Sequence, residues 1–123
     1  MLDCGFFVGW PNPPSPEAHL RILQDSYIAW VAIDAGKVVG FITAVSDGVI
    51  SAYIPLLEVL PQYQGRGVGK ELTSKMIESL KNLYMVDLLC EADMQNYYAK
   101  FGMHKAVGSI LRNYERQSCS EIT

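Results

Sequence analysis

Two neighbouring segments are apolar over most of their length and carry the side chains that strands favour. Residues 27–33 and residues 38–45 are rich in aromatic and β-branched types. Residues 34–37 lie between them and read as a turn because they contain Asp34 and Gly36. The pattern therefore predicts an antiparallel hairpin.

A third strand-like run follows a second turn, at Asp47 and Gly48. Residues 49–59 are long and apolar, which suits a buried strand. Pro55 lies inside this run and has no backbone N–H to donate. We therefore expect a bulge, a sheet edge or a split in the sheet near Pro55.

A short helix is expected before the hairpin, over residues 16–24. Ser15 suits the N-cap position and Pro16 suits the first helical position. Leu20 and Leu23 are expected to face the core.

After Gly69 the apolar positions recur every three or four residues, with charged side chains on most of the opposite face. The apolar set is Val68, Leu72, Met76, Leu80 and Leu83, and the charged set is Lys70, Glu71, Lys75, Glu78 and Lys81. This predicts an amphipathic helix. Residues 86–90 are then expected to form a short buried strand.

The last third of the chain predicts a helix and a strand. Residues 93–101 suit a short helix that stops at Gly102. Residues 104–114 are expected to form the final strand, and the polar residues 117–123 are expected to fray.

The predicted order is helix, hairpin, long strand, helix, strand, helix, strand, which indicates an α/β (α+β) fold. The long strand, the following helix and the strand at 86–90 would form a right-handed βαβ unit. With 123 residues, half of them apolar, we expect one domain spanning residues 1–123.

Charge and hydropathy exclude several classes of protein. The net charge is −3 and the pI is about 5.3, which argues against a nucleic-acid partner. No window approaches the roughly 18 to 20 apolar residues of a membrane span, so no membrane association is expected. Asp3 and the lack of a basic N-terminal region argue against a signal peptide, which favours a cytoplasmic location.

Cysteine usage points to reduced thiols. Cys4, Cys90 and Cys119 are odd in number and far apart, and no C-x-x-C pair exists. His19 and His104 are isolated as well. We therefore expect neither a disulfide framework nor a metal site.

A glycine-rich loop separates the long strand from the amphipathic helix. It reads Gln64, Gly65, Arg66, Gly67, Val68, Gly69, Lys70. Glycines let a backbone approach a ligand closely, and a helix start offers unpaired N–H groups and the positive end of its dipole. Together these features predict a phosphate site.

Two other phosphate-binding loops do not fit this segment. A P-loop requires Gly five residues before the Gly-Lys pair and Ser or Thr after it, where this chain has Gln64 and Glu71. The dinucleotide fingerprint requires a third glycine where Lys70 stands.

What does fit is Q/R-x-x-G-x-G/A, met by Gln64, Gly67 and Gly69. This resembles the pyrophosphate-binding motif of the GNAT N-acyltransferase superfamily. Residues 57–63 look like that family's fourth strand and its lead into the loop. Residues 97–103 resemble its F-Y-x-K-x-G-F segment. The resemblance covers about residues 27–114.

The resemblance implies a mixed, mostly antiparallel sheet splayed near Val59, with helices on both faces, and acetyl-CoA as co-substrate with no metal. Strand main chain would pair with the pantetheine arm, and an amide near Val59 would polarise the thioester carbonyl. The loop would hold the pyrophosphate; Arg66 and Lys70 would add charge or simply lie in solvent. The cofactor-binding residues implied are Leu57, Val59, Gln64, Gly65, Arg66, Gly67, Val68, Gly69 and Lys70.

The resemblance also suggests catalytic residues. Tyr98 falls on the family's tyrosine, which lies near the CoA sulfur and helps the thiolate leave; the alternative is a core tyrosine. Tyr97 falls on a packing position. Glu58 is a lone carboxylate in an apolar strand and is our candidate general base, unless it faces water. Asp87 is the second candidate, with a structural hydrogen bond as its alternative role.

Two departures from the family pattern stand out. Glu91 occupies the position where the family often has Asn. The family also usually begins with a strand and a helix, whereas only 26 residues precede Tyr27. We therefore expect the first strand to be missing, replaced or supplied by a partner. An uncovered strand at 27–33 leads us to expect a homodimer.

The sequence thus predicts an N-acetyltransferase that moves an acetyl group from acetyl-CoA to a primary amine by direct attack in a ternary complex. The alternative is a non-catalytic or regulatory acetyl-CoA-binding module. The acceptor is a small-molecule or peptide amine. The acidic pI favours a cationic one, such as a polyamine, an aminoglycoside or a lysine amine.

Overall fold

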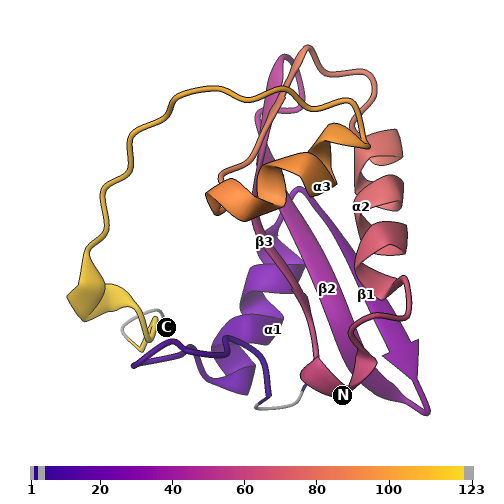
Figure 1. The fold of residues 1–123 in the computed structure, drawn as a ribbon. Coiled ribbons are helices and arrows are strands. Elements are labelled where there is room, and N and C mark those ends of the chain that lie inside the picture. Colours follow the sequence, from indigo (N-terminus) through magenta and orange to yellow (C-terminus); the bar gives the residue numbers. More distant parts are fainter. Residues whose placement is uncertain (1, 3–4, 121–123) are drawn as a thin grey trace.

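A computed structural model describes residue 2 and residues 5–120 of the chain; Met1, Asp3, Cys4 and residues 121–123 lie outside the described residues. Four strands form one sheet in the order β1-β2-β3-β4 (Figure 1). The strands are β1 Ile28–Asp34, β2 Lys37–Ser46, β3 Ser51–Val59 and β4 Met85–Asp87. The first two pairings are antiparallel and β3 pairs with β4 in parallel. The predicted mixed, mostly antiparallel sheet is confirmed.

Within the described residues, three α-helices accompany the sheet. They are α1 Pro16–Asp25, α2 Val68–Ser79 and α3 Gln95–Ala99. Short 3-10 turns lie at η1 Pro61–Tyr63, η2 Ala92–Met94 and η3 Tyr114–Arg116. The helix predicted over 93–101 is therefore split between η2 and α3, and α3 ends at Ala99, with Lys100 as its C-cap, before Gly102, where φ is 89°.

The hairpin forms as predicted. Ala35 and Gly36 connect β1 to β2 with φ values of 52° and 78°, and Asp34 pairs with Lys37 across the turn. Two positive φ angles are typical of the type I′ turn, whose twist matches that of the flanking strands.

Helix α1 begins as predicted but presents a different face. Ser15 Oγ accepts a hydrogen bond from the Ala18 N–H at 3.1 Å. The expectation for Leu20 is wrong, because its side chain is 48% exposed, whereas His19 is 1% exposed. His19 and Leu23 are four residues apart and share the face toward the sheet, and Leu20 lies about 100° around the helix from His19.

A bulge interrupts β3 at the predicted place. Thr43 pairs with Leu56, but Val45 pairs with Tyr53, so β3 holds one extra residue around Pro55. The bulge shifts the alternation of side chains. Both Ile54 and Leu57 consequently pack on the α2 side of the sheet.

Each face of the sheet carries its own core. The core under α2 contains Ile42, Ala44, Ala52, Ile54, Leu72, Met76 and Leu80. The core on the other face contains Phe6, Phe7, Val38, Val39, Phe41 and Leu60, with Leu23 of α1 packed against it. Helices therefore cover both faces, as expected, with α1 and α2 on opposite sides (Figure 1).

The predicted last strand is wrong. Residues 103–113 have no regular structure and arc away from the sheet to the left of Figure 1. The strand predicted at 86–90 is also shorter, because β4 ends at Asp87. A strand needs a paired edge, and the far end of this segment is tied to the N-terminal segment, where the Asn12 N–H donates to Gln117 Oε1 at 2.9 Å. That bond also holds part of the tail expected to fray.

Candidate functional site

The outer edge of β3 is open along its second half. β4 pairs only with Ser51, Ala52 and Tyr53, and beyond them no described strand covers this edge. The sheet therefore opens just after Tyr53, several residues before Val59, where we expected the splay. The reason is that β4 is only three residues long.

The direction of the Val59 peptide groups follows from two hydrogen bonds. The Leu60 N–H donates to the Val39 carbonyl at 2.8 Å and so points toward β2. Neighbouring residues in a strand point their N–H and C=O groups to opposite edges, so those of Val59 point outward. The Gln64 side chain confirms this, since its Nε2 donates to the Val59 carbonyl at 3.0 Å. The Val59 N–H is therefore presented at the open edge.

A cleft of about 560 Å³ lies along this edge. Its walls are Val8, Trp10, Pro55, Leu56, Leu57, Glu58, Val59, Pro61 and Gln64. The structure thus brings the predicted residues Leu57, Glu58, Val59 and Gln64 to one cleft. Val8 and Trp10 also line this cleft, and no sequence motif indicated them as site residues.

The glycine loop leads from the cleft to the start of α2. Gly65 and Gly67 have φ values of 77° and 84°, which other residues adopt only with strain. A Cβ added at either would meet no atom within 4 Å, so the outer surface of the loop is open. Gly67 is the N-cap and has no side chain to bond the helix start. The N–H groups of Val68, Gly69 and Lys70 precede the first intrahelical bond and face solvent or a ligand.

The two basic residues of the loop are exposed, and one is held in place. The Arg66 guanidinium lies 5.1 Å from the centre of the Tyr63 ring, a distance suited to a cation–π contact. The Tyr63 hydroxyl in turn donates to Asp34 at 2.7 Å. Arg66 is thereby positioned beside the loop, and Lys70 lies at the exposed start of α2.

Helix α3 brings two tyrosines to this region. A Cβ added at Gly69 would lie 3.6 Å from the Tyr97 hydroxyl oxygen and 3.7 Å from a Val59 methyl group. The Tyr97 hydroxyl therefore reaches the start of α2, although the sequence marked Tyr97 only as a packing residue. The Tyr97 and Tyr98 rings are perpendicular, with centres 5.0 Å apart.

Tyr98 is half-buried on α3. Burial raises the pKa of its hydroxyl above the ordinary value of about 10, and the neighbouring Tyr97 and Cys90 raise the pKa further. The hydroxyl therefore keeps its proton near neutral pH and can donate a hydrogen bond.

Glu58 lies on the opposite face of β3 from Val59 and is half-buried. The Phe7 N–H donates to Glu58 Oε1 at 2.8 Å and lies 3.0 Å from Oε2. Burial raises the pKa of the Glu58 carboxyl, and hydrogen bonds from the Phe7 and Val8 N–H groups partly offset that rise. The other candidate base, Asp87, is exposed on β4.

The segment that binds Glu58 is itself anchored by aromatic packing. Phe7 has a φ of 62°, a conformation that costs about 1–2 kcal/mol for a residue with a Cβ. Its ring packs against Trp10 and His19, with centres 4.9 and 5.0 Å away. The turn signal at Gly5 and Gly9 around two phenylalanines was the only sequence clue to this arrangement.

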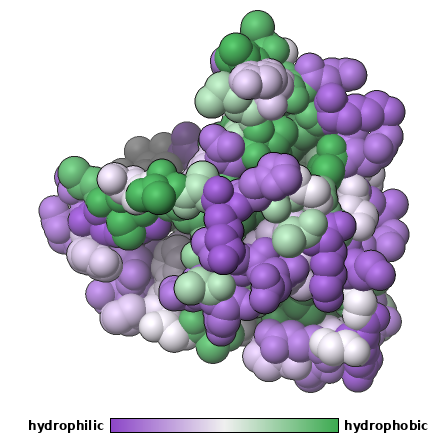
Figure 2. Space-filling view, turned by 45° about the horizontal axis from the view of Figure 1, so that its top comes forward, coloured by the Kyte–Doolittle hydropathy of each residue, from purple (hydrophilic) through white to green (hydrophobic). Residues whose placement is uncertain are grey.

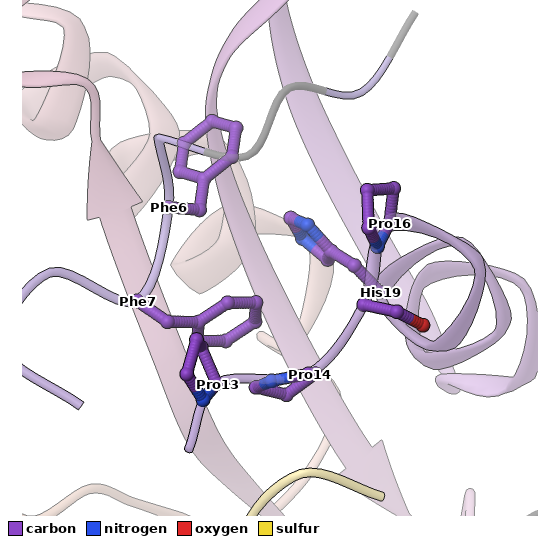
Figure 3. A pocket seen from close by; sticks show the side chains of 7 residues that line it. Phe6, Phe7, Pro13, Pro14, Pro16 and His19 are labelled. Atoms are coloured by element: carbon purple, nitrogen blue, oxygen red, sulfur yellow. The ribbon is translucent and has the colours of Figure 1, made fainter. Parts of the chain in front are cut away.

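His19 and Phe7 also line a smaller cavity of about 230 Å³, together with Phe6, Pro13, Pro14, Ser15 and Pro16 (Figure 3). Burial lowers the pKa of His19, so its imidazole is neutral near pH 7. Within the described part of the chain, its Nε2 has no hydrogen-bond partner.

Among the described residues, no group of three or more His, Cys, Asp or Glu side chains could hold a metal ion. None of the helices described is long and apolar enough to cross a bilayer.

Comparison with known proteins is consistent with this geometry. The model of the Acetyltransferase (GNAT) family matches residues 1–103. The uncharacterized N-acetyltransferase ycf52 of Pyropia yezoensis is 31% identical over 103 residues, which cover 80% of this chain and 59% of that relative. The chain therefore spans less than two thirds of the length of this relative. The chloroplastic GCN5-related N-acetyltransferase 1 of Arabidopsis thaliana is 28% identical over 98 residues, which are 77% of this chain and 50% of that protein.

Solved structures agree with the sequence match. A putative acetyltransferase from Deinococcus radiodurans R1 has a TM-score of 0.90 and 43% identity, over 94% of this chain and 81% of that one. An aminoglycoside N-acetyltransferase solved in complex with CoA has a TM-score of 0.59, over 79% of this chain and 83% of that one. Its identity is 19%, so it supports the fold alone. With the family match spanning more than half of its residues, this chain belongs to the GNAT acetyltransferase family.

Proposed function

We propose that this chain transfers an acetyl group from acetyl-CoA to a primary amine by direct attack in a ternary complex. One observation carries the proposal: the open edge of β3 ends at a glycine loop and at the uncapped start of α2. An open strand edge suits an extended, amide-bearing pantetheine arm, and a helix start suits a diphosphate. CoA carries these two groups in one molecule.

Acetyl-CoA supplies the activated thioester, and the residues of the chain bind and polarise it. We assign the outward N–H of Val59 to the thioester carbonyl oxygen, where it would stabilise developing negative charge. Gln64 then has a positioning role, because its bond to the Val59 carbonyl fixes the adjoining backbone at the strand end. Leu57 contributes main chain, and the loop from Gly65 to Lys70 takes the pyrophosphate.

We assign Tyr98 to the leaving sulfur. Its raised pKa makes complete proton transfer to a thiolate unfavourable, since an alkyl thiol has a pKa of about 8.5. A hydrogen bond to the sulfur requires no such transfer and strengthens as charge grows there. The Tyr98 hydroxyl would therefore assist turnover more than binding.

We assign Glu58 the role of general base. Its raised pKa brings the carboxylate closer to the pH at which it can both accept a proton and stay ionised. The N–H groups of Phe7 and Val8 now occupy its oxygens. An incoming ammonium group also donates N–H bonds and carries full charge, so it would compete for the same carboxylate.

The cleft favours one class of acceptor. Its lining combines Trp10, Val8 and two prolines with a single ionisable group, Glu58. A polycation such as an aminoglycoside would find one carboxylate there. We therefore propose a monoamine with an apolar or aromatic substituent, in place of the polycationic acceptors that the acidic pI suggested.

A second candidate function is a CoA-binding module without turnover. The contact that favours it is the same one that holds Glu58, because a carboxylate bound to two backbone N–H groups is a weaker base. Turnover separates the two candidates. The module would bind CoA and acetylate no amine.

The test follows release of the CoA thiol with a panel of amines. Phenethylamine and tryptamine represent the proposed class, and spermidine and kanamycin represent polycations. We expect acetylation of the first pair at the higher kcat/KM. Binding of CoA in a calorimeter with no thiol release on any amine would favour the module, and absence of binding would contradict both functions.

We propose that residues 1–123 act as one domain, and that the chain works in a reducing compartment such as the cytoplasm or a plastid. The exposed free thiol of Cys90 suits such a compartment, and a chloroplastic relative makes the plastid a specific alternative.

A further inference from the structure

Exposed apolar side chains are widespread on this protein. Figure 2 shows hydrophobic side chains gathered at the top of the view and on a lobe at the left. Val49 and Tyr84, for example, are largely exposed, and neither lines the cleft beside β3. Exposure alone therefore does not mark a binding site. A residue that recognises a ligand should also lie in a cleft and have groups there that no other part of the fold uses.

The two tryptophans of the chain, Trp10 and Trp30, provide an internal comparison. Each is 37% exposed. Trp30 lies on β1, and its indole N–H donates to Ser79 Oγ at 3.0 Å. Lys75 Nζ lies 5.2 Å from the centre of the Trp30 ring, a distance suited to a cation–π contact. The ring and the N–H of Trp30 therefore both have partners within the fold.

Trp10 lies in the wall of the cleft, together with Glu58 and Val59. Among the described residues that line the cleft, it is the only aromatic one. Within the described part of the chain, no group accepts a hydrogen bond from its indole N–H. A tryptophan N–H usually has a partner where the ring is covered. The ring and the N–H of Trp10 are therefore available to a ligand in the cleft, unlike those of Trp30.

The turn over residues 7–10 holds Trp10 at the cleft. The Trp10 backbone N–H donates to the Phe7 carbonyl at 3.1 Å, and the two rings pack with centres 4.9 Å apart at an angle of 54°. The Phe7 N–H in turn donates to Glu58 Oε1 at 2.8 Å. One turn therefore fixes both the aromatic wall and the candidate base. A surface that is ordered before the ligand arrives loses less entropy on binding.

The cleft suits a ligand with one positive charge and one ring. Glu58 is the one ionisable side chain among the described residues that line it, and a carboxylate attracts the cationic form of an amine. Trp10 provides a π surface in the same cleft. An aromatic ring gains more from such a surface than a saturated ring of similar size, because aromatic pairs add stacking to the burial of apolar area.

We propose that Trp10 is the specificity-determining residue of the acceptor cleft, and that it stacks on the aromatic ring of an arylalkylamine whose amino group lies at Glu58. The inference rests on the proposed function, because it places the acceptor in the cleft that holds the candidate base. It goes further by naming one side chain that selects aromatic rings over saturated ones. Trp30 has no part in this selection.

The first experiment measures binding without turnover. Trp30→Phe leaves Trp10 as the only tryptophan, and Trp10→Phe leaves only Trp30. Titration with phenethylamine in the presence of CoA should change the emission of the Trp30→Phe variant to saturation and leave that of the Trp10→Phe variant constant. Circular dichroism verifies that both variants fold. Because no acetyl group is transferred, a failure of the proposed reaction leaves this result readable.

The second experiment compares three amines as acceptors: phenethylamine, 2-cyclohexylethylamine and propylamine. The wild-type chain should prefer phenethylamine to the saturated analogue by roughly fivefold in kcat/KM, the scale expected of one aromatic contact. Trp10→Leu should abolish this preference and leave kcat/KM for propylamine within about twofold of wild type, whereas Trp10→Phe should keep most of the preference. Trp30→Leu is the matched control and should leave the preference unchanged.

Three outcomes would overturn the proposal. Phenethylamine leaves the emission of Trp10 unchanged, Trp10→Leu keeps the preference for the aromatic ring, or Trp10→Leu lowers kcat/KM equally for all three amines. The last result would make Trp10 a structural support of the turn that holds Glu58. Saturable quenching of Trp10 with no acetylation of any amine would support the ring site and contradict the proposed reaction alone.

Discussion

The two halves of β3 differ in their backbone pairing although they belong to one strand. Before Pro55, Ala52 and Tyr53 are paired on both sides, with β2 and with β4. After Pro55, residues 56–59 are paired with β2 alone, and their other edge borders the cleft. The bulge at Pro55 marks the boundary. A strand paired on both sides has all its backbone groups committed, so only the second half can offer main chain to a ligand.

The side chains of the two halves differ in the same way. Ala52 and Ile54 are buried under α2 and serve packing. Glu58 and Val59 lie at the cleft and serve the proposed chemistry. The first half should therefore control stability, and the second half should control binding and turnover, so substitutions can separate the two effects.

The largest expected effect is on stability, from Ile54 in the half of β3 that precedes Pro55. Ile54 is 4% exposed in the core under α2. Ile54→Ala should lower the free energy of unfolding by about 2–5 kcal/mol, because it removes buried methyl groups and leaves a cavity. CoA affinity of the folded protein should stay within about twofold. Urea unfolding and calorimetry at low temperature measure the two quantities; equal losses in both would break the separation.

The next effect is on turnover, from Glu58. Glu58→Gln should reduce kcat about 100-fold while CoA affinity is retained, because the amide cannot accept the amine proton. Asp87→Asn is the control, since Asp87 is the other candidate carboxylate and is exposed on β4. If Asp87→Asn loses turnover and Glu58→Gln does not, the base is Asp87.

The pH profile adds a test with a definite sign. The pKa of Glu58 is raised by burial, so the carboxylate form is lost as pH falls through a value above the ordinary 4.3 or so. Activity should fall on the acid side with a midpoint above that value. The Glu58→Gln variant should lack this acid limb, and an unchanged limb would assign it to another group.

Two adjacent tyrosines allow a finer division of roles. Tyr98→Phe should lower kcat about 10- to 1,000-fold with CoA affinity nearly unchanged, because its help appears only as charge develops on sulfur. Tyr97→Phe should instead weaken CoA binding about threefold and spare kcat, since its hydroxyl reaches Gly69 at the loop. Single-turnover kinetics with CoA titrations distinguish them. Full turnover by Tyr98→Phe, with chemistry shown to limit the rate, would leave Tyr98 a packing residue.

The sequence predicts those parts of the fold that depend on the backbone preferences of a few neighbouring residues. The hairpin turn at Ala35 and Gly36, the Ser15 cap and the bulge at Pro55 each depend on one or two residues with a strong backbone preference. The glycine loop belongs to the same class, because Gly65 and Gly67 both adopt positive φ. At this loop the sequence motif and the backbone geometry agree, because both depend on glycines that adopt positive φ.

The features that sequence reasoning missed depend on long-range contacts. Residues 104–114 have strand-like composition, but a strand forms only where an edge is free to accept it. The bond between the Phe7 N–H and Glu58 joins positions 51 residues apart, and no local pattern indicates it. His19 took the buried place expected for Leu20 because the aromatic rings of Phe6, Phe7 and Phe41 surround it.

The most direct test of the central claim is CoA binding by the Gly67→Val variant. A branched side chain at a φ of 84° strains the loop and projects into the space assigned to the pyrophosphate. Gly36→Val is the matched control, because Gly36 has a φ of 78° and open space around it but lies in the β1–β2 turn. Calorimetric titration should show a loss of about 2 kcal/mol, roughly 30-fold in Kd, for Gly67→Val and wild-type affinity for folded Gly36→Val. An unchanged Kd in a folded Gly67→Val variant would contradict the assignment of this loop to CoA.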